Sequence, residues 1–180
     1  MSATDTQLVA RLRSGERAAF DEVYAGYQQR IYGFLLRLSG RREVADDLFQ
    51  ETWMRLARHA PTLREDTDLA AWLFTVARNL YRSHQRFAIF DRLRGRDVTT
   101  MELAAGASPE QETAGRRAVQ ALERALALVG AAHREILLLV GVEGLEPSQA
   151  AQVLGVSAET ARQRLLRARV ELGKHMGDER

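Results

Sequence analysis

The sequence predicts an all-α protein of two small helical domains joined by a flexible linker, with a helix-turn-helix in the C-terminal domain. Apolar residues recur at steps of three and four through most of the chain, as on one face of an α-helix. Nothing in the first half alternates with the period of two that is typical of a half-buried strand. Between two helical stretches the periodicity fades, and glycine, threonine and acidic residues replace it. These three observations favour two helical domains without a sheet.

The first domain, expected over residues 1–94, begins with a short helix at about 6–13. A long helix follows and ends at Gly40, because glycine tolerates the left-handed conformation of a helix C-cap. A third helix is expected over 42–59. Asp68 then suits the N-cap of a fourth helix, because its carboxylate can accept a hydrogen bond from the first turn.

Residues 95–108 are expected to form an acidic, flexible linker, and the second domain is expected over 109–180. The residues Ser-Pro-Glu-Gln at 108–111 mark its start. A capping serine, a proline at the first helical position and a glutamine three residues after the cap form a capping box. Glycines then separate helices that are expected near 109–129, 132–142, 147–154 and 157–176.

Charge is distributed unevenly along the chain. The net charge is only +2, from 26 basic residues, 25 of them arginine, and 24 acidic ones. Residues 69–96 carry six arginines against one aspartate (+5), residues 97–115 carry four acids and no base (−4), and residues 160–174 carry four arginines and one lysine against one glutamate (+4). A GC-rich genome can explain the preference for arginine. The distribution nevertheless gives two basic helical stretches separated by an acidic segment.

Composition disfavours several functional classes. The absence of cysteine excludes a disulfide framework, a thiolate metal site and a cysteine nucleophile. The four histidines are dispersed and no glycine-rich phosphate loop occurs, so we expect no enzyme, no metal and no cofactor. No apolar run of about 18 residues and no signal peptide is recognisable, so we expect a cytoplasmic protein without membrane insertion of its own.

The segment PSQAAQVLGVSAETARQRL, residues 147–165, has the pattern of a helix-turn-helix. Ser157 caps the second helix, and Glu159 in its first turn complements the helix dipole. Arginine pairs bidentately with guanine and glutamine with adenine, and further arginines hold phosphates. A solvated helix face is the competing interpretation. The outer surface of this helix is expected to present Arg162, Gln163, Leu166 and Arg167 to bases, and Arg164 and Arg169 to phosphates.

One face of the third helix combines two carboxylates, an amide and a methionine at positions i, i+3, i+4 and i+7. Leu48 can point inward from the same helix. The face is either simply solvated or meets a basic partner helix around an apolar contact. It consists of Asp47, Gln50, Glu51 and Met54.

The fourth helix carries a polar stripe of Asn79, Arg82 and Arg86 at i, i+3 and i+7. This stripe suits an amide contact to a base and cationic contacts to a nucleic-acid backbone. Trp72 follows the apolar periodicity and is expected in the core. For the remaining aromatic residues of the helix, both core packing and base stacking remain possible interpretations. These residues are Tyr81, Phe87 and Phe90.

Four motifs follow one another along the chain: ADDLFQETW at 45–53, AWLFTVARNL at 71–80 with the arginines after it, SPEQ at 108–111, and the helix-turn-helix. In this order and spacing they resemble the extracytoplasmic-function (ECF) group of the sigma-70 family of bacterial RNA polymerase sigma factors. The resemblance covers about residues 8 to 172. It implies a protein without catalysis of its own that recruits core polymerase to a promoter and helps to melt the DNA.

The resemblance also implies a partner for each face. The third helix resembles the surface that docks on the clamp helices of the largest polymerase subunit, with Asp47, Leu48, Gln50, Glu51 and Met54 as contacts. The fourth helix resembles the reader of the minus-ten element, with Arg78, Asn79, Arg82 and Arg86 as contacts. Residues 61–67 resemble the loop that receives a flipped base. The helix-turn-helix resembles the reader of the minus-thirty-five element, with Arg162, Gln163, Arg164, Leu166, Arg167 and Arg169 as contacts.

Further partners are implied by the resemblance alone. The flap of the second-largest polymerase subunit is expected to hold the C-terminal domain, and the linker is expected to thread toward the active-site or RNA-exit channel. An anti-sigma factor, often tethered to the membrane, is expected to hold the protein inactive.

A second hypothesis remains, namely a helix-turn-helix regulator that acts without docking on polymerase. It explains the C-terminal motif but neither the acidic face of the third helix nor the basic fourth helix. Such a regulator retards duplex DNA alone, whereas a sigma factor needs core polymerase to do so.

Overall fold

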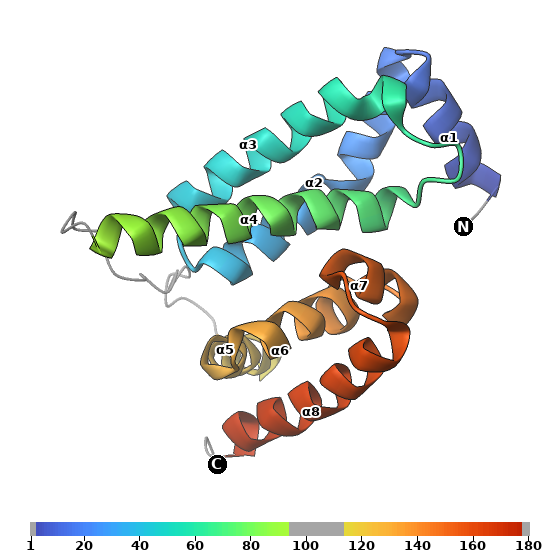
Figure 1. Ribbon diagram of the computed structural model, residues 1–180. Helices are drawn as coiled ribbons and strands as arrows, with labels where there is room; N and C mark the ends of the chain where they lie inside the picture. Colours follow the sequence, from blue (N-terminus) through green and yellow to red (C-terminus); the bar gives the residue numbers. More distant parts are fainter. Residues whose placement is uncertain (1–2, 94–113, 178–180) are drawn as a thin grey trace. The chain divides into compact units, whose positions relative to one another are not determined.

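The computed structural model describes residues 3–93 and 114–177, and it divides the chain into two compact units (Figure 1). Unit 1 is Met1–Glu102 and unit 2 is Leu103–Arg180. Every regular element within the described residues is helical, which confirms the all-α prediction. The predicted linker at 95–108 and the predicted capping box at 108–111 lie outside the described residues.

Unit 1 is a bundle in which α2, α3 and α4 pack against one another. Figure 1 shows α1 at the end of this bundle where α3 finishes and α4 begins. Gly40 ends α2 with φ 64° and donates its N–H to the Leu36 carbonyl at 2.8 Å, and the Asp68 carboxylate accepts the Ala71 N–H at 2.9 Å, both as predicted. The elements are α1 (Ala3–Arg13), α2 (Arg17–Ser39), α3 (Arg42–His59), the 3-10 turn η1 (Ala60–Thr62) and α4 (Leu69–Leu93).

Aromatic and aliphatic side chains fill the core of unit 1. The rings of Phe34 and Phe74 meet edge to face with centroids 5.2 Å apart, and both side chains are fully buried. A second cluster joins α2 to α3, where the Trp53 ring lies 4.7 Å from Tyr24 and 5.9 Å from Phe49. Aromatic pairs of this kind add to the free energy gained from area burial. The position of α3 on the bundle is therefore fixed from below by aromatic packing.

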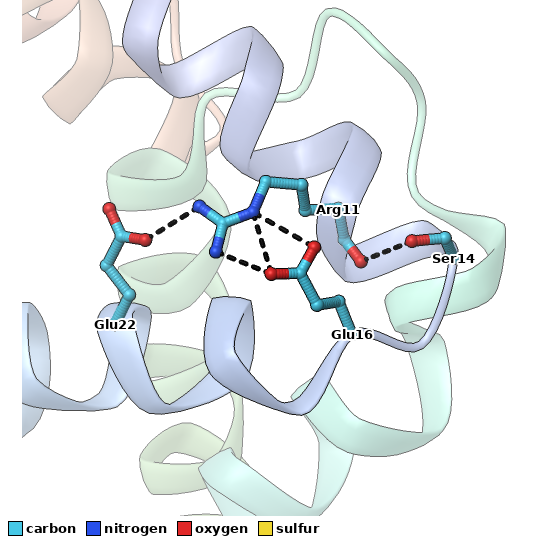
Figure 2. A network of polar contacts seen from close by, with 4 residues as sticks. All are labelled: Arg11, Ser14, Glu16 and Glu22. Carbon is cyan, nitrogen blue, oxygen red and sulfur yellow. Dashed lines mark hydrogen bonds and ion pairs between the residues drawn. The ribbon is translucent and has the colours of Figure 1, made fainter.

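Helix α1 is held on the bundle by a buried apolar face and an exposed polar network. Val9 and Leu12 are buried. Figure 2 shows the Arg11 guanidinium between two carboxylates, at 2.7 Å from Glu16 and 2.8 Å from Glu22. Because Glu22 belongs to α2, this network connects α1 to the next helix across the turn.

Unit 2 surrounds a short helical segment that is buried on all sides. The five consecutive residues 135–139 are all buried, which an amphipathic helix at the surface does not permit. The sequence predicted one helix near 132–142, and the structure instead changes from α to π geometry at Leu137. The elements are α5 (Ala114–Leu128), α6 (Ala131–Ile136), the π-helical η2 (Leu137–Val142), α7 (Pro147–Leu154) and α8 (Ala158–Gly177).

None of the helices in the described parts of the chain is both long and apolar enough to cross a bilayer.

Candidate nucleic-acid and protein interfaces

Helices α7 and α8 form the predicted helix-turn-helix. Gly155 ends α7 in the left-handed region with φ 67°, which favours glycine, and it donates its N–H to the carbonyl groups at the end of α7. Ala150 and Ala161 are fully buried, one from each helix. Small side chains at these positions let the two helices approach closely. The turn and the packing together fix the direction in which α8 projects.

The first turn of α8 is capped as the sequence predicted. The Ser157 hydroxyl accepts the backbone N–H of Thr160 at 3.1 Å. Leu166 is 66% exposed, Arg164 is half-buried, and the other predicted contacts are exposed on the same helix. A leucine so exposed beside charged side chains suits apolar contact with a thymine methyl group. The exposed contacts are Arg162, Gln163, Arg167 and Arg169.

Glu159 binds two of these predicted base contacts. Its Oε2 accepts hydrogen bonds from Arg162 Nε at 3.3 Å and Nη2 at 2.9 Å, and its Oε1 accepts one from Gln163 Nε2 at 3.0 Å. The Arg162 hydrogen bond, followed by that of Gln163, lowers the pKa of the Glu159 carboxyl below its ordinary value. The sequence predicted only a dipole role for Glu159. The sequence does carry a signal for these contacts, because Arg162 and Gln163 follow Glu159 at i+3 and i+4.

A second carboxylate connects α8 to the start of α6. Glu171 accepts the backbone N–H of Gly130 at 2.8 Å and is hydrogen-bonded to His133 Nδ1. The His133 contact, followed by the Gly130 N–H, lowers the pKa of the Glu171 carboxyl. The C-terminal half of α8 is thereby attached to the body of unit 2.

The predicted docking face of α3 is only partly available. Asp47 and Gln50 are exposed and Met54 is 50% exposed. Leu48, predicted as a contact, is only 8% exposed and packs beneath the face rather than on it, because it lies on the inward side of the helix. The available surface of this set is therefore Asp47, Gln50 and Met54.

Glu51, the remaining member of the docking face, already has two partners. Its Oε1 lies 3.0 Å from Arg55 Nε and 2.8 Å from Arg58 Nη2. The hydrogen bond from Arg55 is the largest cause of the lowered pKa of Glu51. The negative charge that this residue offers to a partner is consequently reduced by its own helix.

On α4, Asn79, Arg82 and Arg86 are exposed and line an open pocket of about 380 Å³ with further side chains of the helix. Arg78 does not share this surface, since it is 6% exposed. It follows Phe74 by four residues, and Phe74 is fully buried, so Arg78 lies on the inward side of the helix. The sequence missed the other described residues of this pocket, which are Ser83, Gln85 and Ile89.

The aromatic residues of α4 have different environments. Tyr81 is 9% exposed, and its hydroxyl accepts a hydrogen bond from Gln85 Nε2 at 2.5 Å, so it belongs to the core. Phe87 is 71% exposed next to the basic stripe. Trp72 is half-buried, with its ring 6.4 Å from that of His59. The side chain of Phe90 lies outside the described residues.

The loop before α4, residues 61–67, is held by one buried side chain and by an ion pair to α1. Leu63 is buried at 6% exposure. Arg64 and Asp66 form a two-bond pair, each bond 2.9 Å, and Glu65 lies 2.7 Å from Arg13 of α1. Most of the loop's polar atoms thus remain at the surface. Within residues 3–93 and 114–177, no three potential metal ligands gather into a site.

Comparison with known families matches both units. Residues 23–96 match the family model described as Sigma-70 region 2, and residues 119–172 match the one described as Sigma-70, region 4. The first range contains α3 and the exposed stripe of α4, and the second contains the helix-turn-helix.

Individual relatives agree with these matches. The ECF RNA polymerase sigma factor EcfG of Rhodopseudomonas palustris is 34% identical over 79% of this chain and 76% of its own. The ECF RNA polymerase sigma factor BldN of Streptomyces coelicolor is 32% identical over 86% of this chain. The matched part covers 59% of the length of BldN. The co-crystal structure of the sigma factor RpoE with the anti-sigma factor NepR from Bartonella quintana has a TM-score of 0.77 at 25% identity, covering 89% of this chain and 98% of RpoE.

Proposed function

Because the chain belongs to the extracytoplasmic-function group of sigma-70 RNA polymerase sigma factors, we propose that its units recognise separate promoter elements while unit 1 also docks on core polymerase. The protein is a transcription-initiation factor and not an enzyme. A helix-turn-helix regulator acting without polymerase is not favoured, because the region 2 match covers residues 23–96, which such a regulator does not need.

Unit 1 is proposed to bind the clamp helices of the largest polymerase subunit through α3. Exposed Asp47 and Gln50 around half-exposed Met54 support this role, because a basic helix is complementary to such a surface. On docking, Glu51 would give up its ion pair with Arg55 or Arg58 and pair with a basic residue of the partner instead. Leu48 contributes from below by holding the face in position.

Helix α4 is proposed to contact the minus-ten element through Asn79, Arg82 and Arg86. The amide offers both a donor and an acceptor to a base, and the two guanidinium groups suit the backbone of a separated strand. The loop at 61–67 is proposed to receive an extruded base, and its exposed polar residues support that role. Arg78 has no place among these contacts because it is buried.

Unit 2 is proposed to read the minus-thirty-five element in the major groove. Arg162, Gln163, Leu166 and Arg167 would contact bases, while Arg164 and Arg169 would contact phosphates. The flap of the second-largest subunit is the proposed partner that holds unit 2 on polymerase.

We assign region 2 to residues 1–94, the linker to 95–108 and region 4 to 109–180. The matches at 23–96 and 119–172 support this division. Two weak DNA contacts on one chain gain effective concentration once polymerase holds both in register. The protein is proposed to act in the cytoplasm, where an anti-sigma factor restrains it, as NepR binds RpoE in Bartonella quintana.

The single observation that carries this proposal is the exposure of two basic helices in units that each match a sigma-70 region. The test is transcription in vitro with purified core polymerase and a promoter library. Initiation at specific promoters that depends on the added protein is expected. Absence of core binding together with absence of initiation at every sequence would refute the proposal.

Variants separate the two roles. Asp47→Arg places a positive charge against a basic partner, so core binding should be lost, whereas Asp21→Arg on α2 makes the same change elsewhere in unit 1. Arg167→Ala should weaken recognition of the upstream element by about tenfold while core affinity is kept, consistent with the loss of one base contact. Lys174→Ala removes an equal charge from the same helix outside the proposed contacts. Equal effects of Asp47→Arg and Arg167→Ala would contradict the division of roles.

A further inference from the structure

Glu159 makes contacts that helix capping does not explain. The cap of α8 is Ser157, whose hydroxyl already accepts the Thr160 N–H. The carboxylate of Glu159 instead turns to Arg162 and Gln163, with one oxygen for each side chain. Both partners are exposed and both are proposed to read bases.

These contacts restrict which atoms the two partners present to DNA. A guanidinium group has five N–H donors, and Arg162 uses Nε and Nη2 toward Glu159. Its remaining pair of donors at the tip, on Nη1 and Nη2, is the edge left for the two acceptors of guanine. The contact with Glu159 therefore selects one of two bidentate edges.

The same restriction applies to Gln163. A carboxylate only accepts hydrogen bonds, so the atom of Gln163 that faces Glu159 is the amide nitrogen. The amide oxygen and one N–H remain, which is the acceptor and donor pair that adenine requires. Without Glu159, the amide is free to turn and can offer either end to a base.

Glu159 also changes the electrostatics of the recognition surface. Its negative charge lies at 2.9 Å from the Arg162 guanidinium and offsets part of the attraction of α8 for phosphates of any sequence. Glu159 thus has opposite effects on affinity and on selectivity. It weakens the attraction of α8 for DNA of any sequence, and it orders the two side chains that discriminate between bases.

We propose that Glu159 is a positioning residue for sequence discrimination, holding Arg162 and Gln163 as one reading unit at the cost of uniform DNA affinity. The proposal rests on the proposed function of α8 as the reader of the upstream promoter element. It predicts that the loss of Glu159 raises affinity and lowers selectivity together. A change that merely disturbed the helix would lower both.

The test uses the full-length protein in holoenzyme with its core polymerase. Binding is measured on a promoter library randomised in the upstream element, and separately on mixed-sequence duplex DNA over a range of salt concentrations. The variants are Glu159→Ala, which removes charge and acceptors, and Glu159→Gln, which removes the charge but keeps one acceptor oxygen. Glu123→Ala, at an exposed position on α5, is the charge-matched control.

For Glu159→Ala we expect selectivity at the positions read by Arg162 and Gln163 to fall about two- to fivefold, since each exposed helical pair is weak. Affinity for mixed-sequence DNA should rise, and the slope of log affinity against log salt should steepen by up to about 1. Glu159→Gln should show the full affinity change with a smaller loss of selectivity, and Glu123→Ala should leave selectivity unchanged.

Two results would overturn the inference while leaving the proposed function intact. One is unchanged selectivity in both Glu159 variants, which would mean that Glu159 affects DNA binding only through its charge and does not position Arg162 and Gln163. The other is a parallel loss of affinity and selectivity, which would assign it a structural role. If the unaltered holoenzyme enriched no upstream sequence at all, the proposed function of α8 would fail, and this inference with it.

Discussion

Glu171 connects α8 to the start of α6, and this connection depends on the charge of its carboxylate. It binds the Gly130 N–H and His133, which stand at the start of α6, from a position late in α8. His133 and His175 are the titratable groups that lower the pKa of its carboxyl. Only the ionised carboxylate can accept from both partners at full strength.

The stability of unit 2 should therefore depend on pH through Glu171. Because the folded-state pKa of Glu171 lies below its ordinary value of 4.5, its contribution is present above about pH 4.5 and is lost as pH falls through the lowered pKa. Glu171→Gln should remove this contribution and flatten the pH dependence of unfolding in that window. Residue-resolved hydrogen exchange of amides in α6 and α8 measures it. An unchanged pH profile in the variant would show that other carboxylates dominate.

Two neighbouring positions on α4, Arg78 and Asn79, show which site residues the sequence could predict and which it could not. The spacing of Asn79, Arg82 and Arg86 identified an exposed stripe. Arg78 was assigned to the same set from the family pattern, yet a rotation of about 100° per residue turns it toward buried Phe74. Spacing identifies possible partners within a helix, such as Arg55 for Glu51, but the rotamers that decide whether the two side chains pair are not specified by the sequence.

Among the elements, α1 depends on buried leucine more than on its ion pairs. Leu12 is 2% exposed, whereas Arg11 and its two carboxylates lie at the surface, where water and salt screen their attraction. The Arg13–Glu65 contact then connects α1 to the loop before α4. Loss of α1 from the bundle would remove this contact, while buried Leu63 would still hold the loop.

Leu12→Ala should lower the free energy of unfolding of unit 1 by about 2–5 kcal/mol, because it leaves a cavity beneath α1. Arg11→Ala should have a smaller effect that diminishes further as salt is added. Urea denaturation of both variants at low and high salt gives the comparison. A larger loss for Arg11→Ala would reverse this ranking of apolar burial over surface charge.

Element boundaries were predictable where a local residue enforces them. The sequence placed the third helix at 42–59, and α3 has these bounds because Gly40 precedes it and Pro61 follows. The π-helical η2 was not predictable from the same reasoning, since it begins at Leu137 within the buried run 135–139, where no apolar periodicity remains. Such a run packs against neighbours on every side, so the sequence pattern carries no signal for the helical hydrogen-bond register.

At the scale of the molecule, each unit has its own core. The buried residues of unit 1 centre on α2 and α4, and those of unit 2 on α6 and η2. The net charge of +2 is correspondingly the sum of oppositely charged segments along the chain. The sequence predicted this division from charge and periodicity, whereas the surfaces available for docking required the packing of side chains.

Leu138→Ala should lower the stability of unit 2 by about 2–5 kcal/mol, because Leu138 is fully buried in η2. Since the cores are separate, hydrogen exchange in α2 and α4 should be unchanged. Residue-resolved exchange over the whole chain tests both statements in one experiment. Equal acceleration of exchange in both units would mean that they unfold together.

The aromatic packing of unit 1 has a spectroscopic consequence. Every tryptophan, tyrosine and phenylalanine of the chain lies between Phe20 and Phe90, so residues 103–180 contain none. Near-ultraviolet absorbance and intrinsic emission therefore report on unit 1 alone. Trp53 of α3 is buried and its indole N–H has no hydrogen-bond partner among the described residues, so its emission can report on a partner that binds the proposed docking face. Helix α8 carries no aromatic residue that would report binding there.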